Sequence, residues 1–165
     1  NHTLTEIGKE RIRLAGEKIK ADNPLTTQDL DIGFRVFKVD SSNMNDVYYS
    51  AGEYSQDMLV NLEDNIKPDR TDLDLLFACL LDWGLPISLP YTSEQIENCT
   101  VHTYNDGDLV ACFDENIPES VIKEIAKRKP LRAVFRDAGF GSSPEKINVT
   151  EIFKMLAPDT DVKVI

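Results

Sequence analysis

The chain has 165 residues, of which 41% are hydrophobic and 28% are charged, and its formal net charge is −11. A chain of this length is typical of one domain and buries roughly 70% of the surface that it exposes when unfolded. No apolar stretch approaches the roughly 18 residues of a membrane-spanning helix, so the composition argues against a helical membrane protein and favours a soluble globular domain.

The three cysteines favour a reducing compartment. The chain has an odd number of cysteines, Cys79, Cys99 and Cys112, with no CxxC spacing. They lie in apolar segments, where cysteine usually acts as a small hydrophobic residue. No secretory signal is recognisable at the start of the sequence. We therefore expect a cytoplasmic protein.

The acidic charge is concentrated in the middle of the chain. Residues 22–118 contain 19 Asp and Glu against four Lys and Arg, whereas residues 1–21 and 119–165 are each mildly basic. Duplex DNA would be repelled by the middle segment, because contact with phosphate requires clustered Lys and Arg. The acidity mainly predicts a solvated surface, and a docking face for a basic partner is the alternative.

Residues 1–22 predict a helix that links the chain to something outside it. Thr3 and Glu6 have the spacing of a capping box, and an apolar stripe continues to about Ala21. The stripe is thin for a free helix, so we expect it to pack on a part of the protein that this chain does not contain. Residues 23–165 are expected to form a single α/β domain.

Several elements are expected between this helix and residue 90. Phe34–Val39 predicts a strand, and the turn cluster Asp40–Asn43 after it can cap a short helix. Ser55–Ile66 is expected to be helical. Thr71 and Asp74 have capping-box spacing for a further helix that ends before a glycine and a proline. Its core-facing stripe is expected to consist of Leu73, Leu76, Phe77, Leu80 and Leu81.

The second half of the chain predicts a βαβαβ unit that begins with a hairpin. The hairpin strands are Thr100–Tyr104 and Leu109–Phe113, joined by turn-forming residues. The unit continues with a helix over Glu119–Lys129 and a strand over Leu131–Phe135. A second helix follows, for which Asn148 and Glu151 have capping-box spacing and whose inward residues are Ile152, Phe153 and Leu156. The last strand is Asp161–Ile165. Strands joined through helices run parallel. The predicted fold is therefore α/β, a mostly parallel sheet with flanking helices plus a β-hairpin.

Three groups of residues are candidates for chemistry, and each has a simpler structural interpretation. The loop Gly139–Ser143 lies between a strand and a helix, where an anion cradle is conceivable, but its glycine spacing does not fit a nucleotide motif. His2 and His102 lack companions at metal-ligand spacing. Asp114 and Glu115 follow a strand but have no neighbouring base, so surface charge explains them better.

Three further groups have the same two interpretations. Asp40–Asn43 resembles a polar active-site loop, but turn formation explains each of its residues. Trp83 is either an interface anchor or a core residue, and its position at the end of an apolar helix favours the core. The basic residues of the C-terminal part suggest DNA binding or a solvated helix end, and they are Lys127, Arg128, Lys129, Arg132 and Arg136.

Four blocks of the sequence resemble one protein family. They are TEIGKERIRLAGEKIK, GFRVFKVDSSNM, NIKPDRTDLDLLFACLLDWGLPISLP and the tail from Leu109 to Ile165. In order and spacing they are similar to the C-terminal region of the Mod subunit of type III restriction-modification systems, which are adenine-specific DNA methyltransferases. The resemblance implies a parent enzyme that transfers a methyl group from S-adenosylmethionine to adenine, with a Res subunit that cleaves unmodified DNA.

The same resemblance implies that the reactive centre lies outside this chain. The sequence has no DPPY-type tetrapeptide, which would hold a flipped adenine, and no FxGxG-type cofactor loop. We therefore expect no catalytic, cofactor-binding or metal-binding residues here, with S-adenosylmethionine bound only by the full-length parent. The expected role is assembly, through Mod self-association or docking of Res, with DNA contacted through the parent. A direct DNA-binding module and a cryptic nucleotide or cofactor site at Gly139–Ser143 are the alternatives.

Overall fold

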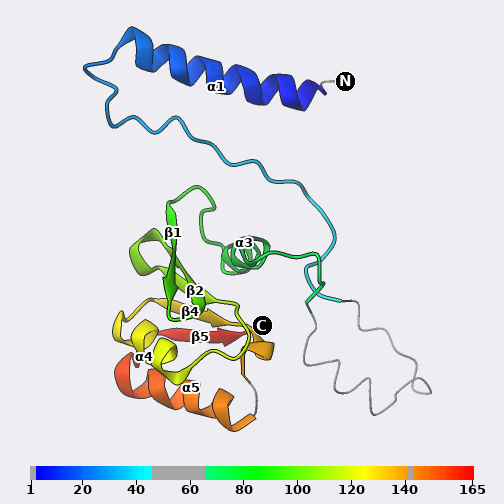
Figure 1. Ribbon diagram of the computed structural model, residues 1–165, viewed down its shortest axis with the longest axis vertical. Helices are drawn as coiled ribbons and strands as arrows, with labels where there is room; N and C mark the ends of the chain where they lie inside the picture. Colours follow the sequence, from blue (N-terminus) through cyan, green and yellow to red (C-terminus); the bar gives the residue numbers. More distant parts are fainter. Residues whose placement is uncertain (1–2, 46–65, 141–142) are drawn as a thin grey trace, which may run out of the picture. The chain divides into compact units, whose positions relative to one another are not determined.

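The computed structural model describes residues 3–45, 66–140 and 143–165, and the chain divides into two units, residues 1–40 and residues 41–165 (Figure 1). The first unit consists of one long helix and the segment that follows it. The second unit contains a five-stranded sheet with helices on both faces. None of the described helices combines the length and the apolar composition needed to cross a lipid bilayer.

The first unit is built on helix α1, Leu4–Asp22. Its N-terminus is capped as predicted, because the Thr3 side chain accepts a hydrogen bond from the Glu6 N–H at 3.3 Å. The segment after the helix folds back along it, so that a Cβ atom added at Gly16 would lie only 2.9 Å from Cβ of Ile32. The strand predicted at Phe34–Val39 is wrong, since these residues have no regular secondary structure.

The second unit is organised by a mixed sheet whose spatial order is the same as its chain order. Strands β1, β2 and β3 are antiparallel, and β3, β4 and β5 are parallel. The strands are β1 Tyr91–Ile96, β2 Cys99–Tyr104, β3 Leu109–Cys112, β4 Arg132–Phe135 and β5 Asp161–Val164. The predicted α/β class, its parallel C-terminal strands and its hairpin are therefore confirmed.

Three of the described helices cover the two faces of this sheet (Figure 1). They are α3 Asp72–Asp82, α4 Glu119–Lys127 and α5 Ser143–Leu156. Short 3₁₀ turns, Asn105–Gly107 and Asp137–Gly139, follow β2 and β4. Helices α4 and α5 pack on one face, which we call the α4/α5 face, and α3 packs on the other, which we call the α3 face.

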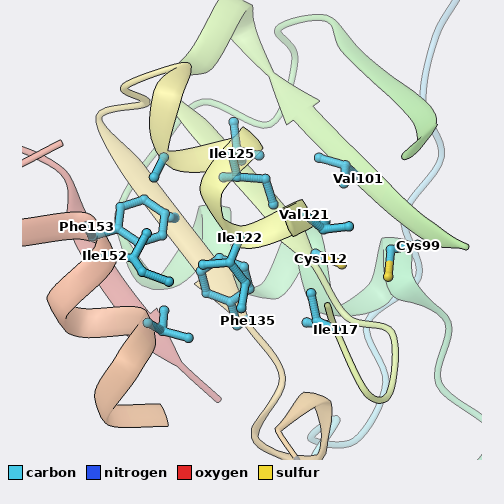
Figure 2. Close-up of a cluster of buried hydrophobic side chains, with 14 of the residues drawn as sticks. Cys99, Val101, Cys112, Ile117, Val121, Ile122, Ile125, Phe135, Ile152 and Phe153 are labelled. Atoms are coloured by element: carbon cyan, nitrogen blue, oxygen red, sulfur yellow. The ribbon is translucent and has the colours of Figure 1, made fainter. Parts of the chain in front are cut away.

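The central strand β3 shows why the chain folds into three layers. Its residues are all buried, with Val110 and Cys112 in the core of the α4/α5 face and Leu109 and Ala111 in the core of the α3 face. A strand that is buried on both faces needs a continuous apolar run rather than an alternating one. On the α4/α5 face, Figure 2 shows the side chains of α4 and α5 meeting those of the sheet around Phe135.

Two helix predictions need correction. In α3 the buried residues are Leu75, Leu76, Cys79 and Leu80, whereas Leu73 is 37% exposed and Leu81 is 66% exposed. Packing against the sheet therefore selects a face rotated from the predicted stripe. Helix α5 begins at Ser143, so Asn148 lies inside the helix and cannot cap it. Its side-chain amide instead donates to the Glu119 carboxylate at 3.1 Å, which connects α5 to α4.

Strand β1 was not predicted, and one predicted helix cannot be compared with the structure. Tyr91–Ile96 has four exposed residues between partly buried ends, so it carries little apolar signal. The helix predicted at Ser55–Ile66 lies outside the described residues except for Ile66, which forms an isolated antiparallel bridge with Met44. The short helix predicted after Asp40–Asn43 also falls mostly outside them.

Candidate functional site

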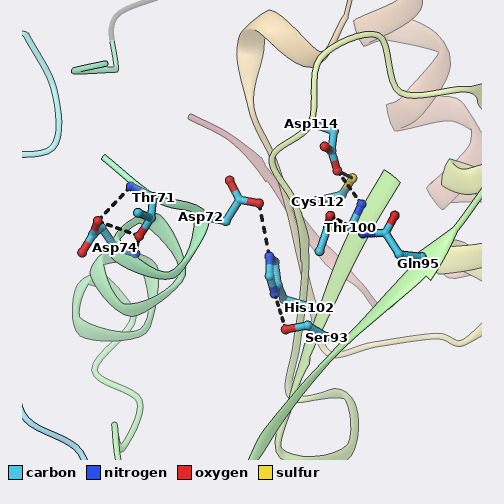
Figure 3. A network of polar contacts seen from close by, with 9 residues as sticks. All are labelled: Thr71, Asp72, Asp74, Ser93, Gln95, Thr100, His102, Cys112 and Asp114. Atoms are coloured by element: carbon cyan, nitrogen blue, oxygen red, sulfur yellow. Dashed lines mark hydrogen bonds and ion pairs between the residues drawn. The ribbon is translucent and has the colours of Figure 1, made fainter. Parts of the chain in front are cut away.

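Two clusters of polar side chains lie on opposite faces of strand β2. Figure 3 labels their members except Cys99, which Figure 2 labels. The histidine cluster consists of Asp72, Ser93 and His102. The thiol cluster consists of Cys99, Cys112 and Asp114. Successive side chains of a strand point to opposite faces, which is why two residues three positions apart on β2 belong to different clusters.

The histidine cluster joins α3 to the antiparallel part of the sheet. His102 is 4% exposed, and its Nδ1 is 2.8 Å from the Ser93 hydroxyl of β1, the strand with which it pairs. Its Nε2 is 3.5 Å from a carboxylate oxygen of Asp72, the first residue of α3. Both ring nitrogens therefore have a polar neighbour, as a buried histidine requires.

The residue types of this cluster are those of a Ser–His–Asp hydrolase, but the geometry differs. In that mechanism the serine contacts Nε2 and the aspartate holds Nδ1. Here the two contacts are reversed, and 3.5 Å is at the outer limit of a hydrogen bond. The arrangement is therefore best suited to fixing the start of α3 against β1 and β2.

The thiol cluster lies where β2 begins and β3 ends. Cys99 is the first residue of β2, Cys112 is the last residue of β3, and Asp114 follows two positions later. Their two sulfur atoms and a carboxylate oxygen all lie within 4.8 Å of one another. The Asp114 carboxylate is 3.8 Å from Sγ of Cys112 and accepts the N–H of Thr100 at 2.5 Å.

Both thiols of the cluster are held in the protonated form. Burial raises the pKa of Cys112 to about 12. Burial also raises the pKa of Cys99, and the negative charges of Asp114 and Glu97 raise it further. A nucleophilic cysteine needs the opposite environment, one that favours the thiolate. The cluster as it stands is therefore not a reactive-thiol site.

The candidate loop Gly139–Ser143 begins as packed core. Gly139 and Phe140 are buried, and the Phe140 ring lies 5.9 Å from that of Phe135. A Cβ atom at Gly139 would lie 2.9 Å from the backbone oxygen of Asp114, so a glycine is needed there for close packing. Gly141 and Ser142 lie outside the described residues, and so does His2. The alternative interpretation of this loop as a cofactor site is not tested.

The structure separates the remaining candidates. Asp114 belongs to the thiol cluster, whereas Glu115, its neighbour in the sequence, is exposed and is not a member of that cluster. Trp83 is partly buried and packs against the core of the α3 face, as predicted. Its ring lies under two cations, Arg132 at 5.9 Å and Lys163 at 5.4 Å from the ring centre.

Arg128 and Arg132, two of the basic residues considered for DNA binding, do not share one surface. Arg128, at the end of α4, forms ion pairs with Glu94 and Glu124. Arg132 lies over Trp83 on the α3 face of the sheet. A groove between α4 and the turn after β1 contains Lys123, Lys127 and Arg128, but also Glu97 and Glu124. Its charge is mixed, whereas phosphate binding needs a cluster of one sign.

Sequence reasoning missed both clusters, because their members are distant in the chain. Asp72 lies 30 residues from His102, and Cys112 lies 13 residues from Cys99. Strand pairing and the docking of α3 on the sheet, not sequence spacing, bring them together. Only the position of Asp114 directly after an apolar strand was a usable signal. Compared with models of protein families, with curated proteins and with solved structures, the chain gave no match.

Proposed function

We propose that this chain is the non-catalytic C-terminal domain of the Mod subunit of a type III restriction-modification system, and that it serves in subunit assembly. The four sequence blocks motivate the family. The proposed role is Mod self-association or docking of the Res subunit, while S-adenosylmethionine and DNA are bound by other parts of the parent enzyme. Under this proposal the domain belongs to a complex in which the parent Mod enzyme carries out site-specific adenine methylation.

Helix α1 carries the argument for assembly. The helix has 19 residues, and none of them is buried. Its large apolar side chains are about half exposed or more, and they are Leu4, Ile7, Ile12, Leu14 and Ile19. Complete burial of one such side chain is worth about 1.5–3 kcal/mol. A partner surface that covered this helix would therefore gain substantial binding free energy.

The composition of α1 also favours a helix that is stabilised by a partner. Helical stability in proteins comes mainly from packing of an amphipathic face rather than from intrinsic propensity. Gly8 and Gly16 lie inside the helix, and each costs roughly 1 kcal/mol relative to alanine. The ion pairs Lys9–Glu6 and Arg13–Glu10 are exposed and add little. Contact with another subunit would supply the missing packing.

The test measures assembly directly. Purified Res subunit is passed over the immobilised 165-residue chain, and light scattering gives the mass of the chain alone. We expect capture of Res, a mass above the 18.6 kDa of one chain, or both. A monomer that captures no Res would contradict the proposed role.

Two double variants of α1 locate the interface. Ile12→Gln with Ile19→Gln removes two apolar side chains seven positions apart on one side of the helix. Glu10→Gln with Glu17→Gln has the same spacing on the opposite side and serves as the matched control. Association should fall at least tenfold in the first variant, since the lost burial exceeds about 1.4 kcal/mol. Equal effects of both variants would show that α1 does not form the interface.

A further inference from the structure

The thiol cluster has the geometry of a small tetrahedral metal site. Metal–sulfur and metal–oxygen bonds of about 2.3 and 2.1 Å place neighbouring ligand atoms about 3.6–3.8 Å apart around zinc. Sγ of Cys112 and Oδ2 of Asp114 are already 3.8 Å apart, and the three ligand atoms lie within 4.8 Å. Side-chain movements of up to about 1 Å would bring all three ligand atoms to these separations.

The ligand types indicate which cation fits. Two thiolates and one carboxylate suit zinc and its thiophilic neighbours, whereas calcium and magnesium require sets of oxygen ligands. Nearby charge favours a cation as well, because the charges that act on Cys99 from Asp114 and Glu97 are both negative. A cation would offset the repulsion that these carboxylates exert on a thiolate.

The position of the cluster supports a ligand role. It lies at the carboxyl end of β3, in the parallel part of the sheet, where α/β folds usually bind ligands. Thr100 donates its backbone N–H to the Asp114 carboxylate at 2.5 Å, which orients that carboxylate as the outer partners of metal ligands do. The two thiols are buried, but Asp114 is partly exposed and the adjacent Glu97 is exposed, which leaves a route from solvent.

We propose that this cluster binds one zinc-class divalent cation through Cys99, Cys112 and Asp114, with a water molecule as the fourth ligand. On binding, the two S–H bonds break, two metal–sulfur bonds form, and both protons pass to solvent. Nothing is oxidised or reduced. The cation would tie the start of β2 to the end of β3, and the proposal is independent of the assembly role.

The test uses zinc alone as the probe. The 165-residue chain, reduced with a phosphine under nitrogen, is incubated with excess Zn²⁺, freed of unbound metal by gel filtration and analysed by mass spectrometry of the elements. We expect about one zinc per chain. Co²⁺ in place of zinc should give the strong near-ultraviolet absorption of cobalt–thiolate bonds.

Three variants assign the ligands. Cys112→Ala should weaken zinc binding at least about 100-fold, and Asp114→Asn, which preserves the shape of the side chain, at least about 10-fold. Cys79→Ala is the matched control, because Cys79 is also buried but lies in the core of the α3 face. If Cys112→Ala fails to fold, the zinc content of Asp114→Asn and the cobalt spectrum of the unmodified chain still test whether the cluster binds the metal. Absence of bound zinc, binding that Asp114→Asn leaves unchanged, or a cobalt spectrum without thiolate absorption would overturn the proposal.

Discussion

Replacement of Gly139 by alanine tests the packing that holds the loop after β4 against the end of β3. The added Cβ would lie 2.9 Å from the backbone oxygen of Asp114 and 2.9 Å from Cδ1 of Ile117. The Ile117 side chain can move, but the Asp114 oxygen belongs to the backbone. In addition, the carbonyl of Gly139 accepts the Ile117 N–H at 2.9 Å, so a shift of the loop would strain this hydrogen bond.

The expected cost follows from two opposing effects. Overpacking of a close contact costs about 1–3 kcal/mol. Loss of glycine flexibility in the unfolded chain returns about 0.4–1 kcal/mol. With each effect taken at the middle of its range, the net loss is about 1.3 kcal/mol, so Gly139→Ala should lower the free energy of unfolding by about this amount, measured by urea denaturation at neutral pH with an unchanged slope.

A double-mutant cycle identifies the cause of this loss. Ile117→Val removes the Cδ1 atom that the new methyl group would meet, so its own cost of about 0.5–1.5 kcal/mol should shrink in the Gly139→Ala background. Gly84→Ala is the control, because Gly84 has a φ of 66° and no atom within 4 Å of the added Cβ, so any loss there comes from the backbone. The reasoning would be refuted if Gly139→Ala were as stable as wild type, or if Ile117→Val cost the same free energy of unfolding with and without Gly139→Ala.

Two further predictions concern helix α3. Leu80→Ala should lower the free energy of unfolding by about 2–5 kcal/mol, whereas Leu81→Ala should change it by less than about 0.5 kcal/mol, because only Leu80 is fully buried. Similar urea midpoints for the two variants would contradict the observed buried face of α3. Hydrogen bonds from Thr71 lower the pKa of Asp74 below its ordinary 3.8. A carboxyl group with a lowered pKa stabilises the fold above its unfolded pKa and loses this contribution as pH falls through the folded value. Asp74→Asn should therefore be destabilising at pH 7, and its difference from wild type should begin to shrink only as the pH falls below about 4. A pH-independent difference in urea denaturation would exclude this origin.

The sequence predicted the elements whose apolar pattern and end signals agree. Helix α4 is an example, since Val121, Ile122, Ile125 and Ala126 share one face, and all four are buried. Strand β3 is another, because a continuous apolar run indicates burial on both sides. In such elements local pattern and tertiary packing favour the same structure, and the α/β class follows from their order.

The errors occur where a partner decides the structure. Phe34–Val39 has strand-forming residues but forms no ladder with any strand in the described part of the chain, and β-propensity without pairing does not make a strand. Tyr91–Ile96 is mostly polar, yet it is a strand because it pairs with β2 through the short turn at Glu97 and Asn98. That turn lacks the Asn-Gly or Asp-Gly signature of a hairpin, so this hairpin has no strong local signal.

The start of α5 carries two conflicting sequence signals. Pro144 is the second residue of this helix, and proline is favoured in the first turn because its missing N–H is not needed there. The capping-box spacing of Asn148 and Glu151 suggested a later start. The two clusters had no comparable signal, since their members meet only through strand pairing and the docking of α3.

The match between spatial order and chain order in the sheet bears on how the protein forms during synthesis. As the chain leaves the ribosome, each new strand finds its neighbour already available, and no strand has to wait for a later one or insert between two earlier ones. Each closure spans only a turn or a single helix, so its entropic penalty is small and rapid maturation is favoured.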